Sequence, residues 1–355
     1  MSSIKKTPLL RSLVLSLAML VSLPTFAAVK KEFNVCWTIY AGWMPWGTIS
    51  TNKIIDKWAD KYGIKINVVQ LNDYIESINQ YTAGQFDGCT MTNMDALTIP
   101  AAGGVDTTAL ILGSYSEGND GVVMKGEGKT LTDLKGMKIY LPELSVSHYL
   151  LVRGLEKAGL AEKDVTVVNT SDADIVSAFA TQNVQAAVAW NPQLSVIKGT
   201  PKTTEVFSSS QVPGELIDMM VVNSETLKDN PALGKALTGA WYEMMGLMKA
   251  QDANALNAMA AASGTDLTGY QAQLKTTHLF YTPQDNIAFV TSADLAKTMQ
   301  RVAAFSFDKG LLGEGAQSAD FIGMSFPGKV TQGDANNVKL RFDDSFVKMA
   351  AAGQL

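Results

Sequence analysis

The chain has 355 residues and a formal net charge of -5, and 46% of its residues are hydrophobic. A chain of this length can bury a large core without support from disulfides or metals. The acidic balance argues against the basic surface that nucleic acids and anionic membranes require, so we expect no nucleic-acid partner.

The first residues have the order of a secretory signal peptide. Lys5 and Lys6 precede an apolar stretch over residues 13–23, and small residues follow near Ala27 and Ala28. A membrane anchor needs about 20 apolar residues, whereas this stretch is shorter, contains serines and ends at a proline. We therefore predict a signal peptide over residues 1–28 and a soluble mature chain in the periplasm, since no cysteine follows closely enough for a lipid anchor.

From residue 33 onward, short apolar runs alternate with amphipathic ones. Runs typical of strands at 33–40, 64–71 and 86–92 are separated by helical patterns, the first of which begins near Thr48. This alternation predicts βαβ units in a mostly parallel sheet with helices on both faces. Ligands of such sheets bind beyond the carboxyl ends of the strands.

The second part of the chain repeats this pattern. Residues 137–141 are predicted as a strand that leads into a helix with a core stripe at Leu151 and Leu155. The segment "VTVVNTSDADIVSAFATQNVQAAVAWNPQL" aligns with "INVVQLNDYIESINQYTAGQFDGCTMTNMDAL" as strand, helix, strand and polar turn, which places Asn191 on Asn93. The repeat predicts two similar α/β lobes, each a doubly wound, mostly parallel sheet.

Two stretches with glycines, 113–124 and 212–223, pass from a polar turn into a strand, and we interpret them as crossings between the lobes. We therefore predict a first lobe over 29–118, a second lobe over 119–215 and a return to the first lobe over 216–355. Glycine absorbs backbone rotation at little steric cost, so we expect the cleft to close about these crossings. The sequence leaves open which of them bends.

The cysteines and histidines indicate neither a metal nor a cofactor. Cys36 and Cys89 are the only cysteines, and both lie in strand-like apolar runs. An oxidising compartment permits a bridge without requiring one, and we expect buried free thiols. His278 has no Cys, Asp or His at metal spacing, and no glycine loop suited to phosphate is present.

Several segments resemble a known family. The run "DLKGMKIYLPELSVSHYLLVRGLEKAGL", the later "AFATQNVQAAVAWNP" and the earlier "YTAGQFDG" resemble the substrate-binding proteins of ABC importers in the nitrate, sulfonate and taurine group. Within that group, "TTHLFYTPQDNIAFV" and "NVKLRFDDSFVKMAA" are similar to the binding proteins associated with urea carboxylase, an enzyme name linked to guanidine metabolism. The resemblance implies a two-lobed periplasmic binding protein of type II. Such a protein closes on a small solute and delivers it to a permease and, through it, to the ATPase.

The resemblance also implies which loops contact the solute, since the family positions matching Gly42, Trp43, the turn at Thr92, the turn around Ser147 and Trp190 supply contacts. Acidic and polar residues of the same loops and of the second crossing complete the candidate ligand-binding set: Gly42, Trp43, Thr92, Asn93, Asp95, Glu117, Asp120, Glu143, Ser147, His148, Trp190, Asn191 and Asp218. Core packing is the alternative role of Trp43 and Trp190. His148 follows Ser145 and Ser147, which suit a helix N-cap, so its alternative role is to orient the loop.

The charges of these loops predict the type of solute. The arginines beyond the signal peptide all lie outside the candidate loops: Arg153, Arg301 and Arg341. The bidentate fork that suits a sulfonate is therefore missing. The second crossing instead adds the carboxylates Glu215 and Asp218 to those of the loops. Carboxylates beside Trp43 and Trp190 would form a cage for a guanidinium or ammonium group. Helix starts after Asn93 and Ser145 favour anions, so a sulfonate, taurine or nitrate stays the alternative.

We expect a binding protein and not an enzyme. A related family of thiamine-precursor synthases shares the implied fold but carries a cysteine-rich motif, and the cysteines here are isolated, with no nucleophile and base pair nearby. A periplasmic domain that feeds a sensor is a further alternative. We expect a monomer.

Overall fold

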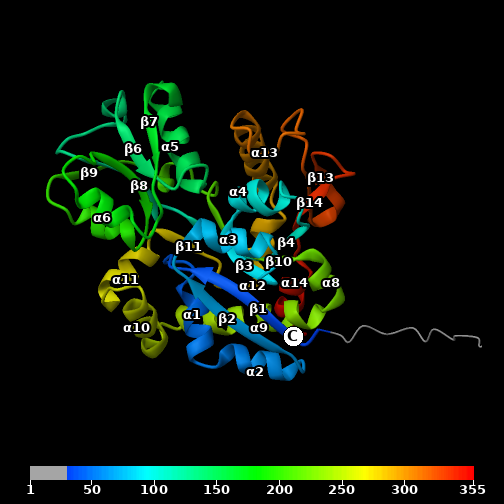
Figure 1. Cartoon of the computed structure of the whole chain (residues 1–355). Coiled ribbons are helices and arrows are strands. Elements are labelled where there is room, and N and C mark those ends of the chain that lie inside the picture. Colours follow the sequence, from blue (N-terminus) through cyan, green and yellow to red (C-terminus); the bar gives the residue numbers. More distant parts are fainter. Residues whose placement is uncertain (1–29) are drawn as a thin grey trace, which may run out of the picture.

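The computed structural model describes residues 30–355, so the predicted signal peptide lies outside the described residues. Two β-sheets surrounded by helices form two lobes, which lie side by side in Figure 1. We call the nine-stranded sheet and its helices the large lobe, and the five-stranded sheet and its helices the small lobe.

The large lobe takes its strands from both ends of the described chain. They are β1 (Glu32–Thr38), β2 (Lys65–Leu71), β3 (Gly88–Thr92), β4 (Thr107–Ser116), β10 (Ile217–Asn223), β11 (Thr277–Leu279), β12 (Gly323–Phe326), β13 (Val330–Gln332) and β14 (Val338–Phe342). Their order is β13-β12-β14-β4-β10-β3-β1-β2, and β11 pairs with β4.

The small lobe is built from the middle of the chain. Its strands are β5 (Asp120–Lys125), β6 (Lys138–Leu141), β7 (Thr166–Asn169), β8 (Ala186–Trp190) and β9 (Thr203–Ser208), in the order β7-β6-β8-β5-β9. Its helices are α5 (Val146–Lys157), α6 (Ile175–Ala180) and α7 (Gln193–Lys198).

Both sheets are mixed, which corrects the expectation of mostly parallel sheets. β1 is parallel to β2 and β3, and β6 is parallel to β7 and β8, as the βαβ pattern predicts. β10 is antiparallel to β3 and β4, and β5 is antiparallel to β8 and β9. The antiparallel strands β5 and β10 are those that the chain enters directly from the other lobe, so no crossover helix sets their direction.

The helices of the large lobe surround its sheet. They are α1 (Met44–Thr51), α2 (Ile54–Lys61), α3 (Tyr74–Thr82), α4 (Asn93–Ala96), α8 (Ser224–Asp229), α9 (Pro231–Lys249), α10 (Ala253–Ala262), α11 (Leu267–Leu274), α12 (Pro283–Val290), α13 (Ala293–Asp308) and α14 (Ser345–Ala351). The helix predicted from Thr48 is instead two helices, because Lys53 adopts a φ of 60° and interrupts the helical backbone between α1 and α2.

Side-chain caps start three helices soon after a strand ends. Asp73 accepts a hydrogen bond from the Glu76 amide at the start of α3, and Ser145 accepts one from the Ser147 amide at the start of α5. The Thr92 hydroxyl accepts a long bond of 3.4 Å from the backbone amide of Asp95 in α4. Such caps satisfy amides that lack intrahelical partners, and here they place three helix N-termini at the strand ends.

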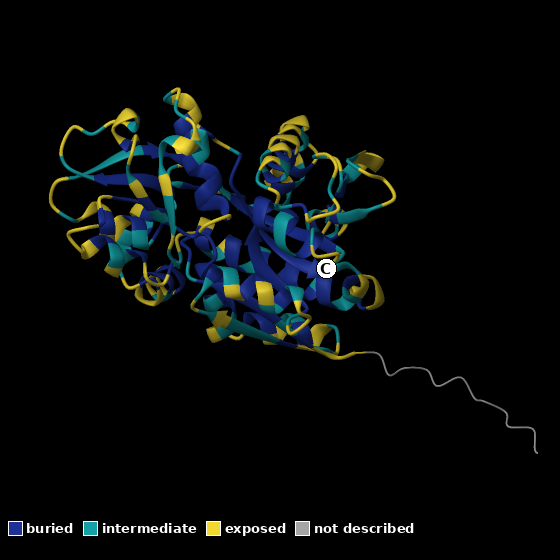
Figure 2. Cartoon of the chain, turned by 45° about the horizontal axis from the view of Figure 1, so that its top comes forward, coloured by how far each residue is buried: buried dark blue, intermediate teal, exposed yellow. Residues whose placement is uncertain are grey.

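The buried apolar side chains join the two lobes in this structure. The largest cluster includes Phe33 of β1 and Val122 of β5, whereas the next residue along, Val123, packs in a smaller cluster on the opposite face of the small sheet. Trp46 stacks on Trp241 of α9 inside the large lobe, with ring centroids 5.1 Å apart. Figure 2 shows the buried residues running through the centre and the exposed ones on outer helices and loops.

The two cysteines form a disulfide, which corrects the expectation of free thiols. Cys36 of β1 and Cys89 of β3 are register partners in adjacent parallel strands, with Cα atoms 4.4 Å apart, and both are fully buried. The sequence placed both residues in strands, but only the register sets them directly opposite each other.

Residues 117–119 and 209–216 connect the two sheets. Each connection contains a glycine with a positive φ, 114° at Gly118 and 72° at Gly214. Glycine takes such angles without steric cost, as expected of a crossing that turns sharply. Ser116 and Ser209 join the two connections through a hydrogen bond of 2.6 Å.

Candidate functional site

A small pocket with buried walls lies between the lobes. Both lobes supply its wall, mostly from strand ends and helix starts, as expected for α/β sheets. Its lining residues are Tyr40, Trp43, Tyr74, Thr92, Asp120, Val146, Trp190, Leu216 and Asp218. Each of them is at most 5% exposed, so a bound solute would lose most of its contact with water.

Four aromatic rings form one side of the cavity. Trp43 lies 5.0 Å from Tyr40 and 5.6 Å from Tyr74, measured between ring centroids. Tyr74 also makes an edge contact of 5.5 Å with Trp190, which comes from the small lobe. The aromatic wall therefore spans both lobes, and its ring faces suit a cation.

Two carboxylates face this aromatic wall. Asp218 Oδ2 accepts hydrogen bonds from Ser114 Oγ at 2.6 Å and from the Tyr40 hydroxyl at 3.0 Å. Asp120 is buried at the first position of β5, where its backbone amide donates to Ser116 Oγ at 3.1 Å. Within residues 30–355, no Lys, Arg or His side chain forms an ion pair with either carboxylate, and the residues found to line the cavity include none of these three types.

The acidity of the two carboxylates reflects this environment. Burial raises the pKa of Asp120 from 3.8 to about 7, opposed by a hydrogen bond from Ser116 and reinforced by the charge of Asp95. Burial also raises the pKa of Asp218 well above its ordinary value, and the charge of Asp120 contributes. This environment therefore favours bound protons or a cation over two bare charges.

Asp95 lies just behind the cavity wall. It is fully buried, and its Oδ2 accepts hydrogen bonds from the Tyr74 hydroxyl at 2.7 Å and from Thr92 Oγ1 at 2.8 Å. Burial raises its pKa to about 6, against the effects of these two bonds and of the Val146 backbone amide. Asp95 Oδ1 has no hydrogen-bond partner of standard geometry, and Trp43 Nε1 has none either.

The structure brings five of the predicted site residues together in the cavity wall: Trp43, Thr92, Asp120, Trp190 and Asp218. Trp43 and Trp190 are both buried among core side chains and exposed to the cavity, so the two alternatives for these residues apply at once.

Two further predicted residues, Asn93 and Asn191, hold the surrounding backbone. Asn93 donates from Nδ2 to the carbonyl oxygen of Glu215 at 3.1 Å and accepts from the Ile217 amide at 3.0 Å. Asn191 donates its backbone amide to Asn119, and its carbonyl oxygen accepts from the Ala41 amide at 3.1 Å. The two repeat-related asparagines therefore each bind one of the crossings.

Gly42, also predicted, lets the Tyr40 ring and Ser114 pack closely against the backbone, because it has no side chain. A Cβ atom at this position would lie 2.7 Å from the Tyr40 ring and 2.9 Å from Ser114 Oγ. Because Ser114 and Tyr40 both hold Asp218, a side chain at residue 42 would disturb that carboxylate.

The structure does not bring the other four predicted residues to the cavity. Glu117 and Glu143 are exposed, and Glu117 lies 3.5 Å from Nδ1 of His278. Their turns face solvent, where a charged side chain stays hydrated. Ser147 is buried in the first turn of α5, and its hydroxyl has no partner.

His148 orients a loop, as its alternative role predicted. Its Nδ1 accepts from the Leu144 amide at 3.1 Å, and its Nε2 lies 3.0 Å from Glu162. Burial lowers its pKa to about 4, followed in size by the charge of Lys309. A neutral imidazole with both nitrogens engaged is not available to a solute.

Four lining residues were not predicted from the sequence: Tyr40, Tyr74, Val146 and Leu216. Tyr40 begins the loop that contains Trp43, so its position next to a predicted contact could have identified it. Tyr74 follows the Asp73 cap at the end of β2, in a strand-end turn equivalent to those considered. Val146 and Leu216 are ordinary apolar residues, and nothing in their local sequence distinguishes them from core residues.

The arginines are engaged elsewhere. Glu215, expected as a cleft carboxylate, instead accepts from Arg153 Nε at 2.8 Å, from Arg301 Nη1 at 3.2 Å and from the Tyr149 hydroxyl at 2.6 Å. This cluster links the second crossing to α5 of the small lobe and to α13 of the large lobe. Burial raises the pKa of Glu215, but the bonds from Arg153 and Tyr149 outweigh it and lower the pKa overall.

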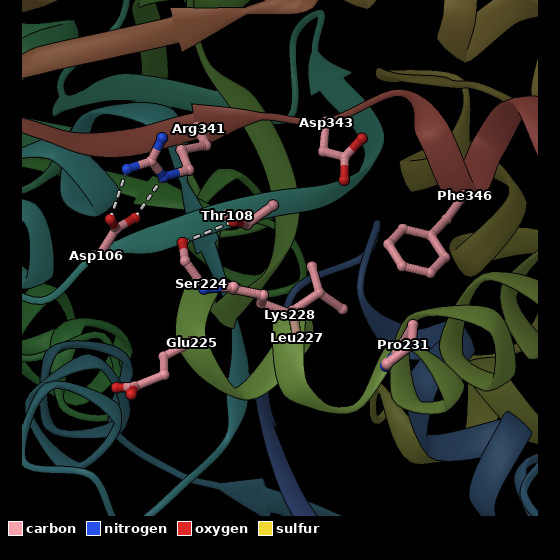
Figure 3. Close-up of a pocket in the computed structure, with 10 residues that line it drawn as sticks. All are labelled: Asp106, Thr108, Ser224, Glu225, Leu227, Lys228, Pro231, Arg341, Asp343 and Phe346. Carbon is pink, nitrogen blue, oxygen red and sulfur yellow. Dashed lines mark hydrogen bonds and ion pairs between the residues drawn. The ribbon is translucent and has the colours of Figure 1, made fainter. Parts of the chain in front are cut away.

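A second, wider depression lies on the large lobe, away from the cleft (Figure 3). Arg341 there points at Asp106 and forms two hydrogen bonds of 2.7 Å with its carboxylate. Thr108 and Ser224 bond each other across the same floor at 2.7 Å. Because the guanidinium is already paired, it offers no free fork to an anion.

Residues 30–355 contain no group of three or more His, Cys, Asp or Glu side chains arranged to hold a metal ion. None of the helices in this range is both long enough and apolar enough to cross a membrane.

The fold defines the class of the protein. The alkanesulfonate-binding protein from Xanthomonas axonopodis pv. citri bound to MOPS is similar with a TM-score of 0.67 and 18% identity, over 81% of this chain and 96% of that one. The likeness confirms the predicted α/β fold of two-lobed type II periplasmic binding proteins.

The family follows from the sequence. Residues 58–255, more than half of the chain, match the family described as NMT1/THI5 like, and the chain belongs to that family. A relative from Brucella abortus (strain 2308), named only as a binding protein, is 29% identical over 197 residues, which are 54% of this chain and 60% of that protein. The taurine-binding periplasmic protein of Escherichia coli (strain K12) is 25% identical over 144 residues, 39% of this chain and 44% of that one. The match thus spans less than two thirds of either relative.

Proposed function

We propose that the chain captures a small, nitrogen-rich solute in the periplasm and delivers it to the permease of an ABC importer. Guanidine is the first candidate, and urea-like compounds come second. The observation that carries this choice is the pair of buried carboxylates, Asp120 and Asp218, in an aromatic cavity whose detected lining has no basic side chain.

Guanidinium matches the chemistry of this cavity. Its N–H groups donate in a plane to carboxylate oxygens, and its face stacks on aromatic rings. Two acceptors, Asp120 and Asp218, and the ring faces of Trp43 and Trp190 supply both kinds of contact. The resemblance of the C-terminal segments to urea carboxylase-associated binding proteins supports the same choice.

Sulfonates and taurine form the second candidate class. The relatives favour it, since one is named for taurine and a similar structure for alkanesulfonates. We rank it second because the Arg fork suited to a sulfonate is absent from the lining residues, while two acids are present.

The proposed location, lobe boundaries and partners are those predicted from the sequence. We propose that residues 1–28 are removed on export and that the mature monomer has a first lobe over 29–118, a second over 119–215 and a return over 216–355. The Escherichia coli relative is named as periplasmic, which supports this location. The partners would be the permease and its ATPase, and we propose no catalytic activity.

The first experiment identifies the solute. Native mass spectrometry of the exported protein should show any retained compound. A thermal-shift panel of stripped protein then compares guanidine, methylguanidine, urea, taurine, methanesulfonate and nitrate. A ligand at about 100 times its Kd stabilises the folded state by about 2.7 kcal/mol. Guanidine should raise the melting temperature by a few degrees, and a shift with taurine or methanesulfonate alone would overturn the choice of solute.

Variants then locate the site. Asp218→Asn removes a charge partner and Trp190→Ala a stacking face, so each should weaken guanidine binding at least about tenfold, the equivalent of about 1.4 kcal/mol. Asp60→Asn on the exposed side of α2 is the matched control and should bind normally. Unchanged affinity in both cavity variants would place the solute elsewhere.

A further inference from the structure

We propose that Asp95 sets the charge selectivity of the cleft, because its buried carboxylate is held directly behind the cavity wall that also contains the N-terminus of α5. The inference rests on the proposed function, since it names the residue that keeps anionic solutes out of a cavity formed for a cation.

The N-terminus of α5 faces the cavity. The helix is 12 residues long, and Val146, its first residue, lines the cavity from the small lobe. The free amides and the dipole at such a helix start attract negative charge. Without an internal carboxylate, this end would favour an anionic solute.

Asp95 supplies that negative charge from the opposite lobe. It is 0% exposed, and Tyr74 and Thr92, both lining residues, fix its Oδ2. Val146 at the start of α5 belongs to the same wall, and Asp95 Oδ1 has no hydrogen-bond partner. The carboxylate therefore lies directly behind a wall that includes the start of α5, and the Val146 backbone amide also lowers the pKa of Asp95.

A second observation concerns a donor in the same wall. Trp43 is 5% exposed, and its Nε1 has no hydrogen-bond acceptor in the described structure. Its N–H and the amides at the start of α5 are the two sets of donors that an oxyanion would need. The negative charge of Asp95, behind the same wall, would repel that oxyanion.

The test is to neutralise Asp95 without changing its shape. We would measure the affinities of guanidinium and methanesulfonate for the full mature chain by calorimetry, in the wild type, Asp95→Asn and Asp95→Glu. In Asp95→Asn, methanesulfonate should bind about tenfold more tightly and guanidinium about tenfold more weakly, which corresponds to about 1.4 kcal/mol each. Asp95→Glu retains the charge and should retain the selectivity ratio within about threefold.

Two further variants complete the test: a control away from the cavity, and a substitute in case Asp95→Asn does not fold. Asp87→Asn removes a buried carboxylate at the start of β3 that pairs with Lys30, away from the cavity, and should leave the ratio unchanged. If Asp95→Asn does not fold, Tyr74→Phe removes one hydrogen bond from Asp95 and should shift the ratio in the same direction, by about threefold.

The outcomes separate this inference from the proposed function. A ratio that stays constant in Asp95→Asn, or in Tyr74→Phe where that variant replaces it, overturns the inference. So does a loss of guanidinium binding with no gain of methanesulfonate binding, since a purely structural role would produce it. A wild type that prefers methanesulfonate overturns the proposed function whatever the variants do.

Discussion

Asp120→Asn should stabilise the ligand-free protein, and the gain should grow as the pH rises. The folded state raises the pKa of Asp120 from 3.8 to about 7, chiefly through burial. Between these two values the folded chain keeps a proton that the unfolded chain has lost. Asp120 therefore lowers the free energy of unfolding as the pH rises through this window, and above it the full cost is present.

The size of the effect follows from the same two values. Each pKa unit corresponds to about 1.4 kcal/mol, so the cost of ionising Asp120 in the empty cavity is about 4 kcal/mol. Asparagine has nearly the same shape and carries no charge. The difference in unfolding free energy between Asp120→Asn and the wild type should therefore increase by about 4 kcal/mol from pH 4 to pH 8.

Calorimetric thermal unfolding at unit steps of pH measures this difference, and it leaves the candidate solutes urea and guanidinium out of the solution. His148, whose pKa burial lowers to about 4, gives an opposite slope between that value and about 6.5, but both proteins share it, so it cancels. Asp60→Asn on the exposed side of α2 serves as the control and should show no such increase. A difference that stays constant across the pH range would show that Asp120 is not buried as a charge in the empty cavity.

Three further predictions concern the cleft and its supports. Guanidinium binding should weaken up to about tenfold per pH unit below pH 7, since the solute must then displace a proton from Asp120; calorimetry that finds no such dependence contradicts this. Glu215→Gln should lower the free energy of unfolding by about 2 kcal/mol, because Arg153 loses a charged hydrogen bond in a partly buried position; thermal unfolding with an unchanged midpoint would contradict it. Replacing Cys36 and Cys89 together by alanine should cost about 4 kcal/mol, because the bridge closes a 53-residue separation in the unfolded chain, and a loss well below 1 kcal/mol in the same assay would exclude that role.

The architecture was predictable where the pattern is local. Apolar runs and caps located β1, β2 and β3 within a few residues, since strand and helix periods differ clearly. The direction of β5 and β10 was not predictable, because it depends on the path of the chain between lobes. The break at Lys53 was missed because a left-handed lysine has no strong signal in the sequence.

The sequence predicted which loops form the candidate site better than it predicted which of their residues line the cavity. Asp120 and Asp218 were predicted from the acidic residues of the loops and crossings, because both lie at polar turns that lead into strands. The same reasoning included Glu215, which is neutralised by Arg153 and Arg301. These arginines are 62 and 86 residues away in sequence, and only the folded structure shows that they meet it.

The positions of the two cavity carboxylates connect solute binding to lobe closure. Asp120 is the first residue of β5 and Asp218 the second residue of β10, so each follows directly after one of the two crossings. The asparagines that the internal repeat made equivalent, Asn93 and Asn191, hold these crossings by hydrogen bonds. A cation between Asp120 and Asp218 would therefore attract the two crossing strands toward each other, and the repeated strand ends would hold the crossings in the closed arrangement. In the proposed function, the hinge and the charge partners of the solute are thus the same short segments of chain, and closure needs no separate relay.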